Sequence, residues 1–303
     1  MSRVLVTGAT GFIGRHALEP LLAAGHEVHA VSSREAVPDA APGIRWHQAD
    51  LLADPTTVIH EVRPERLLHL AWYAEHGRFW TSMENLRWVE ATLALARAFA
   101  AAGGERAVLA GTCAEYDWTA GDGTFAEDSA LRPATLYGVA KHATHELLGA
   151  AAPELGIEFA WGRVFFLYGP YEDERRLVAS VAGALTRGER ASTGVGTQQR
   201  DFMHAADVAA AFAALIDSGV SGAVNVASGE ARTLREVIEA IGRTAGRPDL
   251  LDIGALAPRP DEPDTLVADV TRLREEVGFR PRLGFEEGLA ETVEWWRAQA
   301  PTL

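Results

Sequence analysis

Three side chains in the middle of the chain have the types and order needed for proton transfer to a carbonyl or hydroxyl oxygen. Tyr137 and Lys141 lie four residues apart in a segment of helical character, TLYGVAKHATHELLGA, so both are expected on one helix face. An ammonium beside a phenol is expected to lower the pKa of Tyr137, making it a usable proton donor or acceptor. Thr112 ends a predicted strand, AVLAGT, and offers a hydroxyl to the same oxygen. A Tyr–Lys pair of this spacing is common on helices, so by itself it does not indicate catalysis. The expectation of catalysis depends on the glycine-rich stretch that precedes the pair in the chain.

That glycine-rich stretch predicts a dinucleotide site. Residues 3–7 form a short apolar run suited to a buried strand, and TGATGFIG follows. Gly8 permits a tight turn, Gly11 lets the backbone approach a pyrophosphate, and Gly14 lets the following helix lie close to the strand. The alternative is a strand-to-helix turn that binds nothing, but the strands before and after it favour a cofactor. In such a site Lys141 can also hydrogen-bond the nicotinamide ribose.

The end of the second predicted strand indicates which dinucleotide is bound. An acidic residue there would hydrogen-bond the adenosine ribose 2′-hydroxyl. The sequence instead reads HEVHAVSS, so Ser32, Ser33 and Arg34 offer hydroxyls and a guanidinium that suit a 2′-phosphate. NADP(H) is therefore favoured over NAD(H). The alternative is that Arg34 is a solvated loop residue and Glu35 binds the ribose.

Strand-like and helix-like runs alternate through the first two-thirds of the chain, which is typical of an α/β fold with a doubly wound parallel Rossmann sheet. The chain is then expected to form a smaller carboxyl-side α/β lobe. The predicted domains are residues 1–170 with a return segment at about 204–226, and a lobe of residues 171–203 and 227–303. Strands are predicted near residues 3–7, 27–32, 44–48, 67–71, 106–111 and 158–164, with SGAVNVAS as a further one.

The composition argues against several classes of function. A chain of 303 residues, 48% of them hydrophobic, can bury a large core. Its net charge of −14 disfavours binding to nucleic acid or to an anionic membrane. Cys113 is the only cysteine, and we expect it to be a buried apolar filler. The ten histidines are scattered along the chain, so no metal site is predicted. With no signal-like segment and no apolar run near 18 residues, we expect a cytoplasmic protein.

Nine ordered motifs make the whole chain resemble the extended short-chain dehydrogenases/reductases, of the NAD-dependent epimerase/dehydratase kind that acts on nucleotide sugars. Besides TGATGFIG and YGVAK, they include HLAW from His69, RVFFLYGP from Arg163 and QQRDFMHAADVA from Gln198. The resemblance implies an NAD(P)-binding Rossmann domain and a smaller lobe that grips a nucleotide-diphosphate sugar. It also implies a homodimer through a four-helix bundle, to which a helix near residues 83–102 and the Tyr137 helix would contribute.

Together with the residues singled out above, the resemblance gives two sets of predicted binding residues. The cofactor set is Gly8, Thr10, Gly11, Phe12, Ile13, Gly14, Ser32, Ser33, Arg34, Asp50, Leu51, Leu70, Ala71, Trp72, Asn85, Tyr137 and Lys141. The substrate set is Thr112, Ala114, Glu115, Phe166, Arg200 and Arg259. Arg200 and Arg259 would bind the diphosphate. The alternative for each is a surface salt bridge, to Asp201 or Asp261.

Two departures from the family pattern narrow the chemistry. Related sugar 4,6-dehydratases carry Thr, Asp and Glu in sequence, whereas this chain has Thr112, Cys113 and Ala114. Without that acid and base, elimination of water is not expected. Glu115 lies one position after the place where the dehydratases carry Glu. On a strand, a shift of one residue would turn its side chain to the other face. Phe166 replaces an Asn that often touches the substrate diphosphate.

Once elimination of water is set aside, two reactions of the family remain, ketone reduction and epimerisation. Both would use Thr112, Tyr137 and Lys141. The strand end suited to NADPH favours a reductase that acts on a nucleotide-activated 4-keto-6-deoxyhexose, with the keto position carried over from the resemblance. The alternative is a nucleotide-sugar epimerase that holds its NAD(P) tightly. A non-catalytic NADP(H) sensor is a third possibility, which retention of all three catalytic residues disfavours.

Overall fold

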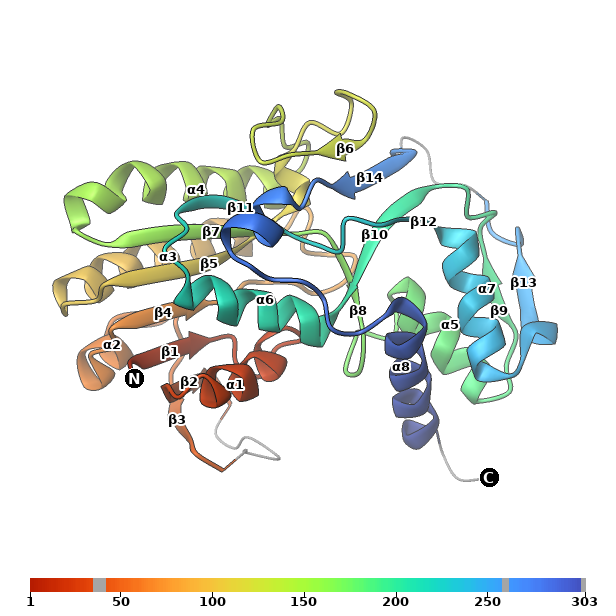
Figure 1. The fold of residues 1–303 in the computed structure, drawn as a ribbon, viewed down its shortest axis with the longest axis horizontal. Coiled ribbons are helices and arrows are strands. Elements are labelled where there is room, and N and C mark those ends of the chain that lie inside the picture. The colour runs from red at the N-terminus through yellow and green to blue at the C-terminus, as the bar shows by residue number, and fades with distance from the viewer. Residues whose placement is uncertain (35–41, 258–261, 301–303) are drawn as a thin grey trace.

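The computed structural model describes residues 1–34, 42–257 and 262–300, and its centre is a seven-stranded parallel sheet (Figure 1). The strand order is β11-β7-β5-β4-β1-β2-β3. The strands are β1 (Arg3–Thr7), β2 (Glu27–Ser32), β3 (Ile44–Gln48), β4 (Arg66–His69), β5 (Arg106–Thr112), β7 (Glu158–Val164) and β11 (Gly222–Val226). This confirms the predicted α/β Rossmann fold. The strand predicted at 67–71 ends earlier, at His69.

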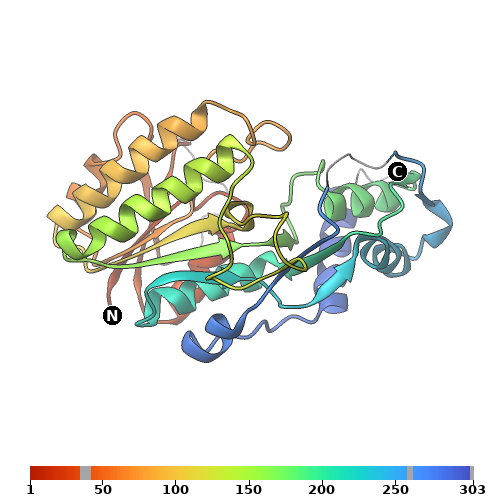
Figure 2. The same cartoon turned by 90° about the horizontal axis from the view of Figure 1, so that it is seen from above.

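Helices cover both faces of this sheet (Figures 1 and 2). They are α1 (Gly14–Ala23), α2 (Thr57–Val62), α3 (Glu84–Ala101), α4 (Leu136–Leu155) and α6 (Ala205–Asp217). The alternation along β1 explains the two layers, because Val4 and Val6 belong to a core shared with α1 and α6, whereas Leu5 belongs to one shared with α3 and α4. No described helix combines the length and apolar character needed to span a membrane.

A second layer of structure lies beyond the carboxyl side of the sheet. Its helices are α5 (Leu177–Thr186), α7 (Leu234–Ala245) and α8 (Phe285–Gln299), which pack around a third core. Its strands pair in the order β12-β10-β14-β6, with β8 beside β10 and a separate β13-β9 pair. They are β6 (Thr124–Phe125), β8 (Phe166–Tyr168), β9 (Ala191–Thr193), β10 (Gln199–His204), β12 (Ala231–Thr233), β13 (Leu251–Ile253) and β14 (Thr265–Ala268). Short helical turns are η1 (Cys113–Glu115), η2 (Pro248–Leu250) and the single π-helical turn η3 (Arg272–Glu276).

The predicted domain boundaries stay a prediction, although two segments cross them. β8 lies within the predicted first domain, yet it pairs with β10 of the smaller sheet. Conversely, Leu266 and Phe279 lie in the predicted lobe and pack into the core beneath α1 and α6. The two parts therefore share strands and core residues, so the position of the lobe is tied to the Rossmann sheet.

The outer faces of α3 and α4 carry the apolar residues that a dimer contact would need. Both helices pack against each other on one face of the sheet (Figure 2). Leu86 on α3 is 44% exposed, and Val139 and Leu147 on α4 are 46% and 53% exposed. These residues are consistent with the four-helix bundle that the resemblance implies. The homodimer itself remains a prediction.

The turn from β1 into α1 is close-packed around its glycines. Gly8 has φ +68°, and a Cβ placed on it would lie 2.7 Å from the Ala71 nitrogen in the loop after β4. A Cβ on Gly14 would lie 2.1 Å from the Gly8 carbonyl oxygen. Both contacts are with backbone, which cannot swing away as a flexible side chain would. These two glycines therefore hold the first helix against the first strand.

We expect Gly14→Ala to lower the free energy of unfolding by about 1–3 kcal/mol, because the methyl group must push strand and helix apart. Urea denaturation measures this. Gly219→Ala is the matched control, since a Cβ at that position meets no atom within 4 Å. Equal stability of the two variants would contradict the close packing described for α1.

Candidate active site

The sheet order brings the predicted cofactor residues to one edge. The carboxyl ends of β1 and β4 are neighbours, and a doubly wound sheet binds its ligand in the crevice where the strand order reverses. Helix α1 begins at this edge with no side-chain cap and no acidic residue in its first turn. Backbone amides at such a helix start suit a pyrophosphate. The residues around this position are Gly8, Thr10, Gly11, Phe12, Ile13, Leu70 and Ala71.

The adenosine end of the predicted cofactor site lies at the ends of β2 and β3. Ser32 is buried, and its hydroxyl accepts a hydrogen bond from the Arg34 backbone nitrogen at 3.0 Å. Ser33 and Arg34 are exposed, whereas Glu35 lies outside the described residues. After β3, Asp50 is exposed beside the buried Leu51 and accepts a bond from the Leu52 backbone nitrogen. Ser32 therefore shapes the turn that presents Ser33 and Arg34.

Tyr137 lies in the first turn of α4, directly beside Thr112. Thr135 caps this helix by accepting a bond from the Gly138 nitrogen, and the Tyr137 nitrogen donates to the Trp80 carbonyl at 3.1 Å. Burial raises the pKa of Tyr137, and a hydrogen bond with Thr112 opposes that rise. The pKa of Tyr137 is therefore raised and not lowered as expected, because loss of hydration is its largest cause. Burial thus favours the phenol over the phenolate at Tyr137.

Lys141 is 4% exposed and lies against aromatic rings. Its Nζ donates to the Ala110 carbonyl oxygen at 2.8 Å and lies 3.8 Å from the centroid of the Trp72 ring. Burial lowers the pKa of Lys141 to about 7, against the opposing charge of Glu115. Near neutral pH the Lys141 amine is thus only partly protonated, and its charge depends on nearby groups.

Asn85 has a different role from the one expected. It is 0% exposed, and its amide nitrogen donates to the carbonyls of Phe79 and Ser82 at 2.7 and 2.9 Å. Its amide oxygen accepts from the Trp72 indole nitrogen at 2.9 Å. With these partners inside the protein, the expected direct cofactor contact of the Asn85 side chain is wrong. Asn85 instead orders the loop that carries Phe79 and holds Trp72 under Lys141.

Glu115 was expected among the substrate-binding residues, and the structure corrects this. The chain after Thr112 does not continue as a strand but turns into η1, which directs Glu115 into the protein. Glu115 is 0% exposed. One carboxylate oxygen accepts bonds from the Thr112 and Trp161 nitrogens, both at 2.9 Å, and the other accepts from Arg163 Nε at 3.1 Å. A carboxylate so enclosed faces these donors and not a sugar.

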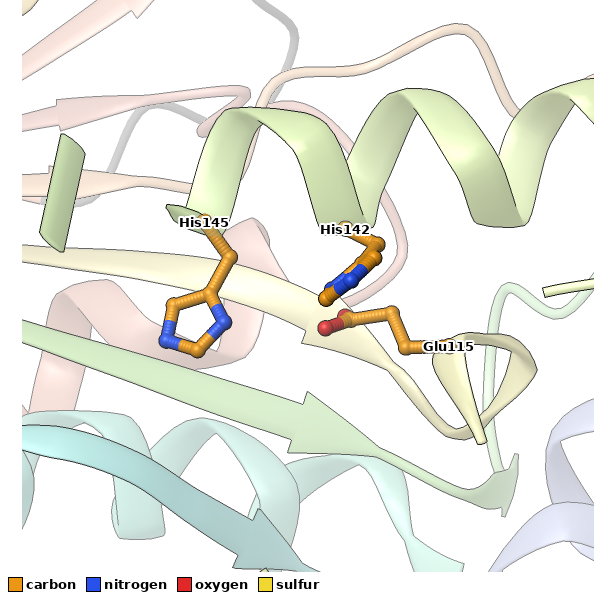
Figure 3. Close-up of side chains that lie close together, drawn as sticks. All are labelled: Glu115, His142 and His145. Atoms are coloured by element: carbon orange, nitrogen blue, oxygen red, sulfur yellow. The ribbon is translucent and has the colours of Figure 1, made fainter. Parts of the chain in front are cut away.

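Two histidines of α4 face this carboxylate, so three potential metal ligands gather in the described part of the chain (Figure 3). The ligand atoms of Glu115, His142 and His145 lie within 4.8 Å of one another. Charge disfavours a cation here, because the one carboxylate is already paired with the Arg163 guanidinium. The absence of a metal site, predicted from the scattered histidines, stays a prediction, and this charge balance supports it.

The remaining residues that were predicted to bind substrate occupy two places. Cys113 and Ala114 are buried beside Thr112, and burial raises the pKa of the Cys113 thiol to about 12, as suits an apolar filler. On β10, the guanidinium of Arg200 lies 5.4 Å from the Phe166 ring centroid, so the structure brings these two predicted residues together. Arg200 forms its ion pair with Glu262 at 3.1 Å, not with Asp201.

Arg259 and Asp261 lie outside the described residues. Sequence reasoning missed the rings around Tyr137. Phe79 and Trp80 meet it edge-on, with centroids 4.8 and 5.8 Å away, and Trp118 meets Trp80 in the same way at 6.5 Å. These aromatic residues come from two loops and show no periodic pattern, so no signal in the sequence marked them. They give Tyr137 an apolar surrounding, consistent with its raised pKa.

Comparison with known proteins agrees with this geometry. The family described as "NAD dependent epimerase/dehydratase family" matches residues 4–227. A UDP-glucose 4-epimerase of Mycolicibacterium smegmatis is 30% identical, covering 97% of this chain and 98% of that protein. The structure of MoeE5 with UDP-glucuronic acid and NAD is 33% identical, with TM-score 0.85 and coverage of 98% and 99%. The UDP-glucose 4-epimerase of Thermus thermophilus with NAD is 29% identical, with TM-score 0.85 and coverage of 97% and 99%.

These relatives support the nucleotide-sugar family that the motifs indicated, but they do not single out ketoreductases. Their names include epimerases, dehydratases and a decarboxylase. The solved relatives described above bind NAD, so they support a nicotinamide dinucleotide without supporting the narrower choice of NADP(H). Because the family match covers most of the chain and the fold and site agree with it, this chain belongs to the NAD dependent epimerase/dehydratase family of enzymes.

Proposed function

We propose that this protein is a nucleotide-sugar 4-epimerase that retains its nicotinamide cofactor. The observation that carries the proposal is the site around Thr112, where Tyr137 and Lys141 are present but the following two positions are the buried Cys113 and Ala114. Such a site can move a proton on and off one oxygen, and it lacks the acid and base for elimination at those positions. The full-length relatives named as UDP-glucose 4-epimerases support this choice.

The residues present fit the cofactor. A Cβ on Gly8 or Gly14 would fill the tight turn, and the uncapped start of α1 leaves amides for the pyrophosphate. When bound, the nicotinamide would accept a hydride from the sugar carbon and return it to the opposite face. As a phenolate, Tyr137 would take the hydroxyl proton during oxidation, and as the resulting phenol it would give that proton back during reduction. Thr112 would hydrogen-bond that oxygen, and Lys141 would hold the nicotinamide ribose.

We expect the purified protein to interconvert UDP-glucose and UDP-galactose, or another 4-epimer pair in a nucleotide-sugar panel, without net consumption of added cofactor. Tyr137→Phe should lower the rate at least about 100-fold, because the proton carrier is lost. Proton NMR of the sugar anomeric signals measures both. Val139→Ala, an exposed position on the same helix, is the control. Turnover only with stoichiometric NADPH oxidation would contradict the epimerase.

A second candidate is the NADPH-dependent 4-ketoreductase acting on a nucleotide-activated 4-keto-6-deoxyhexose. The observation that favours it is the end of β2, where Ser33 and Arg34 are exposed and the last strand residue is Ser32 in place of an acid. This arrangement suits the 2′-phosphate of NADP(H), which an exchangeable reductant would carry. Oxidation of NADPH in the presence of such a keto sugar would select this candidate.

For either candidate we propose NADP(H) over NAD(H), and Arg34→Ala tests it. The substitution should weaken NADPH binding about 10-fold or more while changing NADH binding little, because only NADPH carries the 2′-phosphate. Cofactor titration by calorimetry measures both affinities. Arg45→Ala on the neighbouring strand β3 is the control, because Arg45 is also exposed. Equal losses for the two cofactors in Arg34→Ala would overturn the preference.

We also propose that Arg200 binds the substrate diphosphate when its ion pair with Glu262 opens. Arg200→Met should then weaken UDP binding about 10-fold or more and leave cofactor binding unchanged. Glu262→Gln should strengthen UDP binding or leave it unchanged, because it removes the competing carboxylate. Calorimetry with UDP measures these effects. If both variants lose stability and neither changes UDP affinity, the pair is structural and the assignment fails.

A further inference from the structure

We propose that Glu115 is a positioning residue of the active site: its buried carboxylate fixes the backbone at Thr112 and supplies the counter-charge for the Lys141 ammonium. The inference rests on the proposed roles of Thr112 and Lys141. It holds for an epimerase and for a reductase alike, because both use these residues.

The first part follows from the contacts of η1. The Thr112 nitrogen donates to Glu115 Oε1 at 2.9 Å, and the Thr112 hydroxyl accepts from the Ala114 nitrogen at 3.2 Å. This reciprocal pair is a capping box, which fixes the turn directly after the catalytic strand residue. Glu115 is fully buried, so water does not compete for these bonds. The carboxylate thereby sets the direction in which the Thr112 hydroxyl is presented.

The second part follows from the path between Glu115 and Lys141. Trp161 donates its indole N–H to Glu115 Oε1, and the centroid of the same ring lies 5.8 Å from Lys141 Nζ. The charge of Glu115 opposes the effect of burial on the pKa of Lys141. The same charge raises the pKa of Tyr137. One buried anion thus favours the ammonium of Lys141 and the protonated phenol of Tyr137 together.

The other titratable groups around Lys141 do not supply this negative charge. From β4, His69 is kept neutral, since burial and the Lys141 charge lower its pKa to about 3. From β7, Arg163 is positive and is paired with Glu115 itself. On α4, burial lowers the pKa of His145 to about 4, and Tyr137 is protonated. His142 lies next to Lys141 in the chain and faces the same carboxylate, as Figure 3 shows.

The sign of the charge effect is fixed by the chemistry of lysine. An ammonium is present below its pKa and lost above it, and burial has already brought the pKa of Lys141 to about 7. Removing the carboxylate lowers that pKa further, so the ammonium is lost at a lower pH. For an activity that requires the ammonium, the alkaline limb of the pH profile would therefore move to lower pH.

The test uses the fact that Lys141 is the only lysine in the chain. Protein labelled with 13Cε-lysine gives one lysine NMR signal, and its chemical shift against pH reports the pKa of Lys141 directly. We expect Glu115→Gln to lower this pKa by about one unit or more. The titration needs no substrate, so it remains valid if the proposed reaction is wrong.

A second variant separates charge from folding. Glu115→Gln leaves the Arg163 guanidinium buried without its partner, which can destabilise the fold. The double variant Glu115→Gln/Arg163→Met removes both charges and should recover much of the thermal stability while keeping the low pKa of Lys141. Asp207→Asn, which removes a buried carboxylate from α6, is the control and should leave that pKa unchanged.

A wild-type pKa for Lys141 in the double variant would overturn the counter-charge role and leave Glu115 as a purely structural residue. A fall of the pKa in both Glu115 variants, with no change in Asp207→Asn, would support it. Equal falls in all three variants would also overturn it, because the effect would then follow general loosening of the fold and not the charge at Glu115.

Discussion

The buried ion pair between Glu115 and Arg163 is the interaction on which the carboxyl end of the sheet around Thr112 depends. Arg163 is 1% exposed, and besides Glu115 it donates to the Tyr116 hydroxyl at 3.1 Å and the Glu127 carbonyl at 2.9 Å. Tyr116 in turn donates to the side chain of Asn225 at 2.7 Å. The pair thus ties together β5, β7, β11 and the loop that precedes α4.

This network also joins the two parts of the molecule. The Asn225 amide donates to the carbonyls of Phe125 and Asp269, next to the paired strands β6 and β14. β14 continues through β10 to the smaller sheet. Buried charged groups are costly unless every partner is in place, and removal of one partner typically costs about 3–5 kcal/mol. Such a network therefore tolerates little displacement, and it fixes the smaller sheet relative to the edge where Thr112 ends β5.

The sequence allowed prediction of those features that depend on local pattern. Short apolar runs placed the strands, and the glycines of TGATGFIG marked a turn in which two of them are required by backbone contacts. The predictions that failed concern residues whose surroundings are set by burial in the folded protein. Glu115 was misplaced because a strand was assumed where the chain turns, and the pKa of Tyr137 was misjudged because its aromatic surroundings come from distant loops. Asn85 was given a cofactor contact, although its side chain bonds Trp72 and the loop that precedes α3.

The scarcity of charge at this site bears on the kind of reaction it suits. Next to Thr112 the chain places a buried thiol and a methyl group where dehydratases place two carboxylates, and Tyr137 is surrounded by aromatic rings. Elimination needs separate groups to remove one proton and donate another, whereas redox at a single carbon needs one proton carrier. In the proposed reaction, Thr112, Tyr137 and Lys141 would supply that carrier and its support. The Lys141 ammonium is favoured by Glu115, a carboxylate that the fold buries completely, so the ion pair that orders this end of the sheet would also set the electrostatics of the proposed reaction.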